Sequence, residues 1–150
     1  MTDALIGMGT RVYMQELPTS TTLTLLGEVF SVELPEDSIG EVDATHYGSP
    51  DNMREFIDGL NEPGTGSIGL NWVPGSDTDE LLRTARQDRG KRITRVVTPP
   101  DDGSQMFTWT GKVNAYVRGL PMDDKLTGTV TSRATSKVIE ADASVDPSVI

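Results

Sequence analysis

Alternating apolar and polar positions along the chain predict a protein built mainly from β-strands. The alternation is clearest over residues 107–118, where Phe107 and Trp109 open an apolar face and polar side chains occupy the positions between. Successive strand residues point to opposite faces, so this pattern indicates a long strand with one buried and one solvated face. An Asp-Asp-Gly turn signal at 101–103 precedes it. We therefore expect residues 91–97 to pair with it as a hairpin.

Further strands are predicted wherever β-branched residues and alternation recur between turn formers. One face of the last strand is small and only half apolar, which suits close packing against a neighbouring backbone. The predicted ranges are 10–14, 24–34, 39–45, 66–72 and 126–137.

One helix is expected after the Pro-Gly-Ser break at 74–76. Asp77 is a good N-cap, with Glu80 as its capping-box partner three residues later, and Gly90 is the expected stop. The resulting helix is short and packs on a sheet through an apolar stripe of Leu81, Leu82 and Ala85.

Residues 45–63 are unusual because they combine turn formers with apolar side chains such as Phe56, Ile57 and Leu60. Structureless loops of this length are uncommon in compact domains and tend to be functional. We expect an extended loop arm whose apolar residues need a partner, and a flexible tail over residues 141–150. The predicted fold is a single domain over residues 1–150. It is mainly β, with two packed antiparallel sheets forming a β-sandwich or partial barrel, flanked by one short α-helix and carrying the arm.

The chain has 150 residues, a formal net charge of −10 and no cysteine. Residues 1–60 hold 11 acidic and 2 basic side chains, whereas residues 83–95 hold 6 basic side chains and 1 acidic one. The acidic balance argues against sequence-specific binding of nucleic acid, although it permits contact with DNA that slides without adhering. The compact basic segment can attract another copy of the same acidic chain.

Catalytic chemistry has little support in the sequence. The absence of cysteine excludes disulfides, thiolate metal sites and cysteine nucleophiles, and His46 is the only imidazole. The strongest enzyme candidate is an acidic metal or glycosidase site, but the spacing of its residues fits no calcium loop. Its members are Glu36, Asp37, Glu41, Asp43 and His46. No G-x-S-x-G or phosphate-binding loop occurs, so we expect no enzyme activity, no metal and no cofactor.

The order of motifs from Gly9 to Ile139 resembles the tail tube (major tail) proteins of long-tailed, lambda-like bacteriophages, and also the tail tubes of gene transfer agents. The strongest block is Glu-Val-Asp-Ala-Thr-His-Tyr-Gly-Ser-Pro at 41–50, followed by Arg-Glu-Phe-Ile-Asp-Gly-Leu at 54–60. Then come residues 66–72, Pro-Gly at 74–75, the Leu-Leu helix, Phe-Thr-Trp-Thr-Gly-Lys-Val at 107–113 and a Thr-rich last strand.

This resemblance implies a structural subunit of a virion tail, made in the bacterial host cytoplasm. In the family, six copies close into a ring, their inner sheets join into one barrel, and rings stack into a hollow conduit for DNA delivery. The arm orders against neighbouring copies, and the lumen is usually acidic. The implied partners are other copies of the chain, the tape-measure protein in the lumen, terminator and tip proteins at the tail ends, and DNA in transit. No membrane partner is implied.

The resemblance also suggests placements for individual residues. The inner barrel candidates are residues 24–34, 107–118 and 126–137. The lumen-facing candidates are Glu28, Glu33, Glu36, Glu41 and Asp43. The candidates for contacts between subunits or rings are Phe56, Ile57 and Leu60 on the arm and Arg83, Arg86 and Arg89 on the outer helix. Four basic residues on polar strand faces conflict with a uniformly acidic wall: Lys112, Arg118, Arg133 and Lys137. Either they pair with acids across a subunit boundary or the face assignment is wrong.

Two alternatives stay open at this stage. The chain could be the tube subunit of a contractile or gene-transfer particle, which the sequence does not separate from a phage tail. It could also be a free-standing β-sandwich binding module, for example one that binds carbohydrate, but exposed aromatic residues are scarce. A metal-dependent hydrolase is a more distant third.

Overall fold

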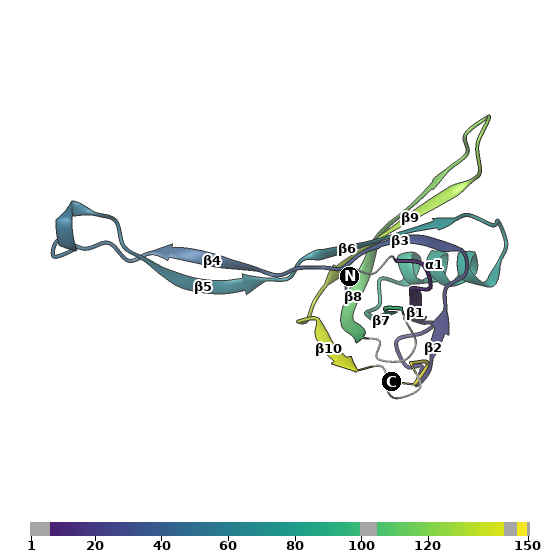
Figure 1. The fold of residues 1–150 in the computed structure, drawn as a ribbon, viewed down its shortest axis with the longest axis horizontal. Helices are drawn as coiled ribbons and strands as arrows, with labels where there is room; N and C mark the ends of the chain where they lie inside the picture. The colour runs from purple at the N-terminus through teal and green to yellow at the C-terminus, as the bar shows by residue number, and fades with distance from the viewer. Residues whose placement is uncertain (1–6, 100–104, 143–146, 150) are drawn as a thin grey trace, which may run out of the picture.

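The computed structural model describes residues 7–99, 105–142 and 147–149. It confirms a mainly β chain with two antiparallel sheets and one helix (Figure 1). The elements in chain order are β1 (Arg11–Gln15), β2 (Leu23–Leu25), β3 (Val29–Glu33), β4 (Ser38–Asp43), a 3-10 turn (Pro50–Asn52), β5 (Phe56–Glu62), β6 (Thr65–Asn71), α1 (Asp77–Asp88), β7 (Arg92–Val97), β8 (Gln105–Gly119), β9 (Thr127–Ala134) and β10 (Ile139–Asp142).

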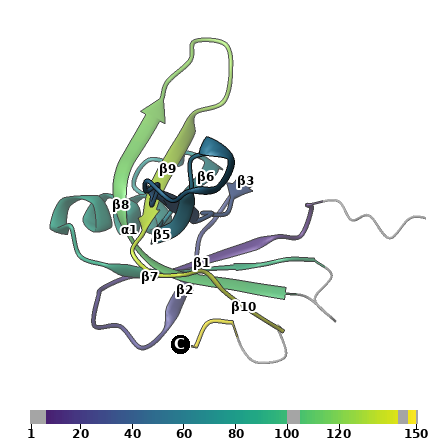
Figure 2. The same ribbon diagram turned by 90° about the vertical axis from the view of Figure 1, so that its left-hand side faces the viewer.

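The larger sheet has eight strands in the order β2-β1-β7-β8-β9-β6-β3, with β10 paired to β8. The expected hairpin of β7 and β8 is present, with Thr94 opposite Trp109. The long strand β8 pairs with β7 over its first half and with β9 over its second half. The sheet therefore bends along β8 and forms two layers, with the first half of β8 in one layer and the second half in the other. Figure 2 shows the two layers one above the other. We call β3, β6, β9 and residues 112–119 of β8 the four-stranded layer.

The main hydrophobic core lies between the layers and under α1. It contains side chains from β1, β6, β7, β8 and β9, and Trp109 is its largest fully buried member. The helix contributes Leu81, Leu82 and Ala85, which are the three residues of its predicted apolar stripe. Close packing of these side chains fixes the helix across the sheet. Within the described residues, no helix is long and apolar enough to cross a membrane.

The single strand expected over residues 24–34 is two strands. The chain turns at Leu26, whose side chain enters the core and whose N–H donates to the Val12 carbonyl. Glu28 then adopts a left-handed conformation with φ 57°. A positive φ is incompatible with a continuous strand, so the prediction of one long strand was wrong at this point.

The predicted faces of β8 hold only as far as Val113. The register with β9 shifts between Val113 and Ala115, so Asn114 is an extra residue in a β-bulge. Beyond it, Tyr116 packs against the core whereas Val117 is 64% exposed. The expectation that Val117 continues the buried face was wrong, because one inserted residue exchanges the two faces of a strand.

The helix ends also differ from the prediction by one residue each. Ser76, not Asp77, is the N-cap, and its hydroxyl accepts a hydrogen bond from the Asp79 N–H. The left-handed residue at the C-terminus is Arg89, with φ 59°, rather than Gly90. A Cβ on Gly90 would lie 2.7 Å from both Pro18 and Arg92 side chains, so this glycine is required for close approach instead of a left-handed turn.

Two segments expected to be irregular contain regular structure. Residues 56–62, expected to be loop, form β5, which pairs with β4. Ala141 and Asp142 of the expected tail belong to β10, which pairs with β8. Farther on, the buried Arg95 guanidinium donates to the carbonyl oxygens of Pro147 and Val149, which attaches that part of the tail to the body.

Candidate assembly surfaces

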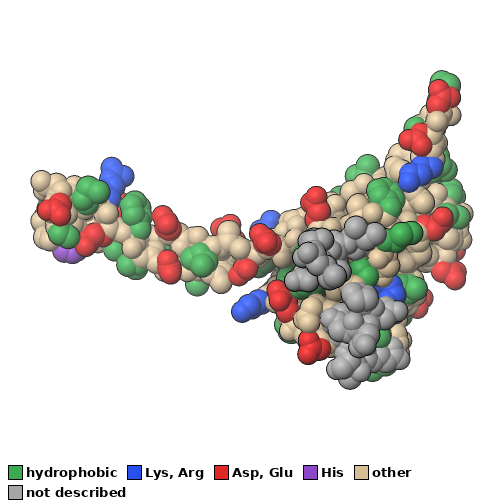
Figure 3. Space-filling model, viewed as in Figure 1, with side chains coloured by type: hydrophobic (Ala, Val, Ile, Leu, Met, Phe, Trp, Pro, Cys, Tyr) green, Lys and Arg blue, Asp and Glu red, His purple; other side chains and the backbone are tan. Residues whose placement is uncertain are grey.

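The arm comprises residues 38–62, which form the hairpin β4–β5 and its tip, and it projects far from the body (Figure 1). Every residue of both strands is exposed or half-exposed. An isolated two-stranded hairpin is marginally stable in water, so such an arm is expected to gain a covering partner. Space-filling shows hydrophobic and acidic side chains side by side along it (Figure 3). The exposed large hydrophobic residues are Ile39, Val42, Tyr47, Met53, Phe56, Ile57 and Leu60.

Close backbone contact holds the two strands of the arm together. The register shifts between Ile39 and Glu41, which places Gly40 and Gly59 near each other. A Cβ on Gly59 would lie 3.1 Å from the Gly40 carbonyl oxygen. Glycine therefore lets the strands cross closely where a larger side chain would push them apart.

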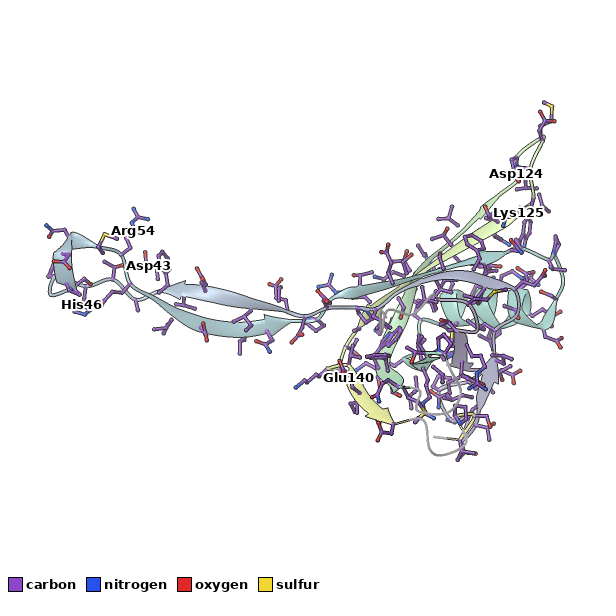
Figure 4. The ribbon with its side chains drawn as sticks, in the orientation of Figure 1. Asp43, His46, Arg54, Asp124, Lys125 and Glu140 are labelled. Carbon is purple, nitrogen blue, oxygen red and sulfur yellow. The ribbon has the colours of Figure 1, made fainter. Side chains whose placement is uncertain are left out.

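The tip of the arm, where Figure 4 labels His46, Asp43 and Arg54, is organised by polar contacts instead of hydrophobic burial. The Ser49 hydroxyl donates to the Glu55 carboxylate at 2.8 Å, and His46 Nε2 lies 3.2 Å from the same carboxylate oxygen. His46 Nδ1 accepts from the Gly48 N–H at 3.0 Å. At the base of the tip, hydrogen bonds from Thr45 lower the pKa of Asp43.

These contacts do not form a nucleophilic site. In a serine hydrolase the imidazole lies between the hydroxyl and the acid. Here the Ser49 hydroxyl donates directly to Glu55, and the nitrogen of His46 that could serve a third group is occupied by backbone. Across the described residues, no group of three or more His, Asp or Glu side chains could hold a metal ion.

The four-stranded layer has two open edges. Among the described strands, β3 pairs only with β6, and residues 112–119 of β8 pair only with β9. Unpaired edge strands expose N–H and C=O groups that can pair with another chain. The outer surface of this layer includes the exposed Val117 but is mainly polar. It is rich in Ser and Thr, including Ser31, Ser67, Thr129 and Thr131.

A buried carboxylate anchors α1 to the four-stranded layer of the body. Asp79 accepts hydrogen bonds from Trp72 Nε1 and the Tyr116 hydroxyl, both at 2.9 Å, and lies 3.3 Å from Arg83 Nε. Burial by itself raises the pKa of Asp79, but these donors and the Arg83 charge outweigh it and the net pKa is lowered. Burial, together with the hydrogen bond to Asp79, raises the pKa of Tyr116. Asp79 escaped the sequence analysis because nothing in the pattern predicted that Tyr116 faces inward after the bulge.

The structure distributes the predicted lumen residues over four places. Glu28 lies in the turn before β3, Glu33 ends β3, and Glu36 follows in the connection to the arm. Glu41 and Asp43 lie on β4 of the arm, away from the four-stranded layer (Figure 4 labels Asp43). The five acids therefore do not form one cluster in the free subunit.

The predicted contact residues occupy two separate surfaces. Phe56, Ile57 and Leu60 are exposed on β5 of the arm. Arg83, Arg86 and Arg89 extend along the C-terminal part of α1 and its cap, where Arg83 is already paired with Asp79.

An open groove separates β3 from the other layer. It has a volume of about 870 Å³ and a mainly apolar lining that includes Val29, Phe30, Val96 and Phe107. The polar side chains in its lining are those of Thr10, Ser31 and Thr98.

Comparison with known proteins is consistent across sequence and structure. The family model for the lambda phage tail tube protein, TTP, matches residues 9–139. No curated protein matches the sequence.

Three solved structures are similar in fold at low sequence identity. The sixfold-symmetric tail of an empty gene transfer agent particle has a TM-score of 0.72 and 14% identity, covering 92% of this chain and 99% of that one. The SPP1 tail tube gives 0.68 and 10%, with 95% and 81% covered. The sheath/tube terminator of an extracellular contractile injection system gives 0.65 and 12%, with 94% and 99% covered.

Proposed function

The chain belongs to the lambda phage tail tube protein family, and we propose from this that it is the repeating subunit of a tail tube, assembling as hexameric rings that stack into a hollow conduit for DNA. The observation that carries the proposal is the combination of two open edges on the four-stranded layer with an exposed apolar arm. Both features are unsatisfied in one copy and can be satisfied by more copies. In this role the protein acts structurally, without a catalytic step.

Ring closure would pair β3 of one copy with residues 112–119 of β8 in the next. The strands β3, β6, β9 and β8 alternate in direction, because each adjacent pair is antiparallel. The next copy's β3 would therefore run antiparallel to β8, so that every neighbouring pair of strands around the barrel would be antiparallel. Closing the barrel removes every exposed edge. The sixfold symmetry of the gene transfer agent tail supports six copies per ring.

The polar outer surface of the four-stranded layer would then line the lumen. Glu33 lies on this surface, and Glu28 and Glu36 flank it at the β3 edge. Glu41 and Asp43 on the arm would lie outside the wall. Apart from Lys112 and Arg133, this surface is rich in Ser and Thr side chains, which suit passage of DNA because they offer its phosphates no positive charge to bind.

Stacking of rings would be mediated by the arm. Phe56, Ile57 and Leu60 would be buried against the neighbouring ring, and Arg83, Arg86 and Arg89 would meet acidic residues of an adjacent ring. The tape-measure protein would occupy the lumen during assembly, with terminator and tip proteins at the ends. The likeness to a contractile injection system component supports a contractile particle as the second candidate setting for the same tube.

Electron microscopy of the concentrated purified protein tests the proposal. Hollow tubes with a regular ring repeat are expected. A protein that stays monomeric at every concentration, and that also fails to join tubes when tail-tip complexes are added as initiators, would contradict it. Glycan binding by such a monomer would favour a free-standing binding module.

A further inference from the structure

The two open edges of the four-stranded layer carry opposite charges. The β3 side, residues 28–37, holds four acidic side chains and no basic one, namely Glu28, Glu33, Glu36 and Asp37. The β8 side, residues 112–119, holds Lys112 and Arg118 and no acid. Complementary charge across an interface steers association and disfavours wrong registers.

An unbalanced pair of like charges marks the β8 edge. Lys112 lies directly opposite Arg133 of β9, and both side chains are exposed. Like charges directly opposite each other destabilise a sheet. Within the described part of the chain, neither residue has a carboxylate at ion-pair distance, and Glu33 at the other edge has no basic partner either.

Lys112, Arg133 and Glu33 lie on the same face of the layer. Glu33 pairs with Ser67, which pairs with Thr131, two residues from Arg133. Residues two apart on a strand share a face. Glu33 and Lys112 therefore occupy neighbouring cross-strand rows of one surface, at its opposite edges.

The geometry of ring closure brings these rows together. If the rows of one copy continue unshifted into the next, Glu33 becomes a diagonal neighbour of Lys112, within reach of long side chains. A shift of two residues places Glu33 directly opposite Lys112. Arg118 is already engaged, because its guanidinium lies 5.6 and 5.2 Å from the ring centroids of Trp72 and Tyr116.

We propose that the Lys112–Arg133 pair at the β8 edge receives the acidic β3 edge, Glu33 with Glu36, of a second copy, and that this charge pairing selects the partner edge during ring closure. The inference rests on the proposed tube function and names the residues that its ring interface uses. It also accounts for basic residues on a surface proposed to line the lumen, because their charge is neutralised across the subunit boundary.

Two charge-reversed variants test this pairing. The first is Glu33→Lys with Glu36→Lys, and the second is Lys112→Glu with Arg133→Glu. Each variant alone brings like charges together at every boundary, so tube yield should fall at least about tenfold. In an equimolar mixture, alternating copies restore opposite charges at every boundary, and tubes containing both variants should return.

The control is Glu16→Lys, which reverses an exposed charge after β1, outside both open edges, and should leave the yield near that of the wild-type chain. Circular dichroism and thermal unfolding establish that each variant is folded. Tube yield is measured by sedimentation and electron microscopy at low and high salt, since screening should weaken the effect.

Normal tubes from either folded variant alone, or no recovery in the mixture, would overturn the pairing while leaving the tube function intact. Normal tubes from Lys112→Glu with Arg133→Glu that no longer conduct DNA would also overturn it, because they would assign the basic pair to the polymer in the lumen. Failure of the wild-type chain to assemble, even with initiators, would instead remove the proposed function and the pairing with it.

Discussion

The body and the arm of this protein are stabilised in opposite ways. In the body, Leu82 is 0% exposed and lies in a core shared by the helix and both layers. On the arm, Leu60 has the same side chain but is 89% exposed. Burial of apolar surface therefore stabilises the body within one copy. The apolar surface of the arm stays exposed to water and contributes no such stabilisation. The difference teaches that the hydrophobic core of the body needs no second copy, whereas the apolar surface of the arm can be buried only against a partner.

The arm is nevertheless shaped before it meets a partner. Its tip is held by hydrogen bonds among His46, Ser49 and Glu55, and by those of Thr45 with Asp43 and Glu55. A binding segment that is already ordered loses less conformational entropy on association. Polar contacts thus give the tip its shape, and the exposed apolar residues leave it available for docking.

The largest expected effect comes from removing the apolar surface of the arm. The triple variant Phe56→Ser, Ile57→Ser, Leu60→Ser should abolish tube formation, because the surface proposed to be buried between rings is lost. Each site is exposed in the single copy, so the free energy of unfolding should change by no more than about 0.5 kcal/mol per site. Sedimentation and urea denaturation measure the two quantities. Tubes at the wild-type yield would show that the arm does not carry the stacking energy.

The second prediction compares the same substitution in both regions. Leu82→Ala should lower the free energy of unfolding by about 2–5 kcal/mol, because it leaves a cavity in the core. Leu60→Ala should change it by less than about 0.5 kcal/mol. Urea denaturation of the monomeric proteins is the measurement. Equal losses in the two variants would mean that the arm is covered within one copy.

Replacing the buried carboxylate should have an intermediate effect on the body. Asp79 is 4% exposed and receives hydrogen bonds from Trp72 and Tyr116 of the four-stranded layer, so Asp79→Asn should lower the free energy of unfolding by about 1.5–3 kcal/mol. The matched control Asp77→Asn, at an exposed position of the same helix turn, should have little effect.

The pH dependence of unfolding gives an independent readout of Asp79. Its pKa is lower in the folded than in the unfolded chain, so its contribution is present above the unfolded pKa and is lost as pH falls through the folded pKa. Acid should therefore destabilise the wild-type chain more steeply than Asp79→Asn, from about pH 4 downward. Parallel pH curves for the two proteins would contradict this assignment.

The smallest expected effect concerns the helix cap. Ser76→Ala should lower the free energy of unfolding by about 1 kcal/mol, because the Asp79 N–H loses its acceptor. Asp77→Ala should cost less, although the sequence pattern pointed to Asp77 as the cap. Thermal unfolding of both variants distinguishes the two positions, and a larger loss for Asp77→Ala would restore the original assignment.

Elements defined by a long, regular period could be predicted from the sequence. The hairpin of β7 and β8 and the apolar stripe of α1 follow directly from alternation and helical spacing. Local backbone events could not be predicted. A left-handed Glu28 divides one expected strand into two, and an extra Asn114 exchanges the faces of β8. The residue type predicts neither conformation, because each one is determined by the tertiary contacts of the neighbouring segments.

The arm was predicted from the sequence only in part. Apolar residues among turn formers indicated a segment that needs a partner, and Phe56, Ile57 and Leu60 are indeed exposed. The pattern indicated a strand over residues 39–45 but not the hairpin, because Gly59 lay in the expected loop, although Gly40 and Gly59 allow the two strands to cross closely. Their roles in assembly stay predictions, because the contacts involved lie between copies.

The sharing of β8 between both layers has a mechanical consequence. Because β8 belongs to both layers, the covalent backbone is continuous from Gln105 in one layer to Gly119 in the other. This continuity resists sliding of one layer over the other. A radial load on the four-stranded layer would reach the other layer of the body through the covalent backbone of β8 and the hydrogen bonds between strands. The side-chain contacts of the core would transmit it as well, but less stiffly. A tube wall built from such subunits would therefore bend at the interfaces between copies before the two layers of one subunit slid past each other.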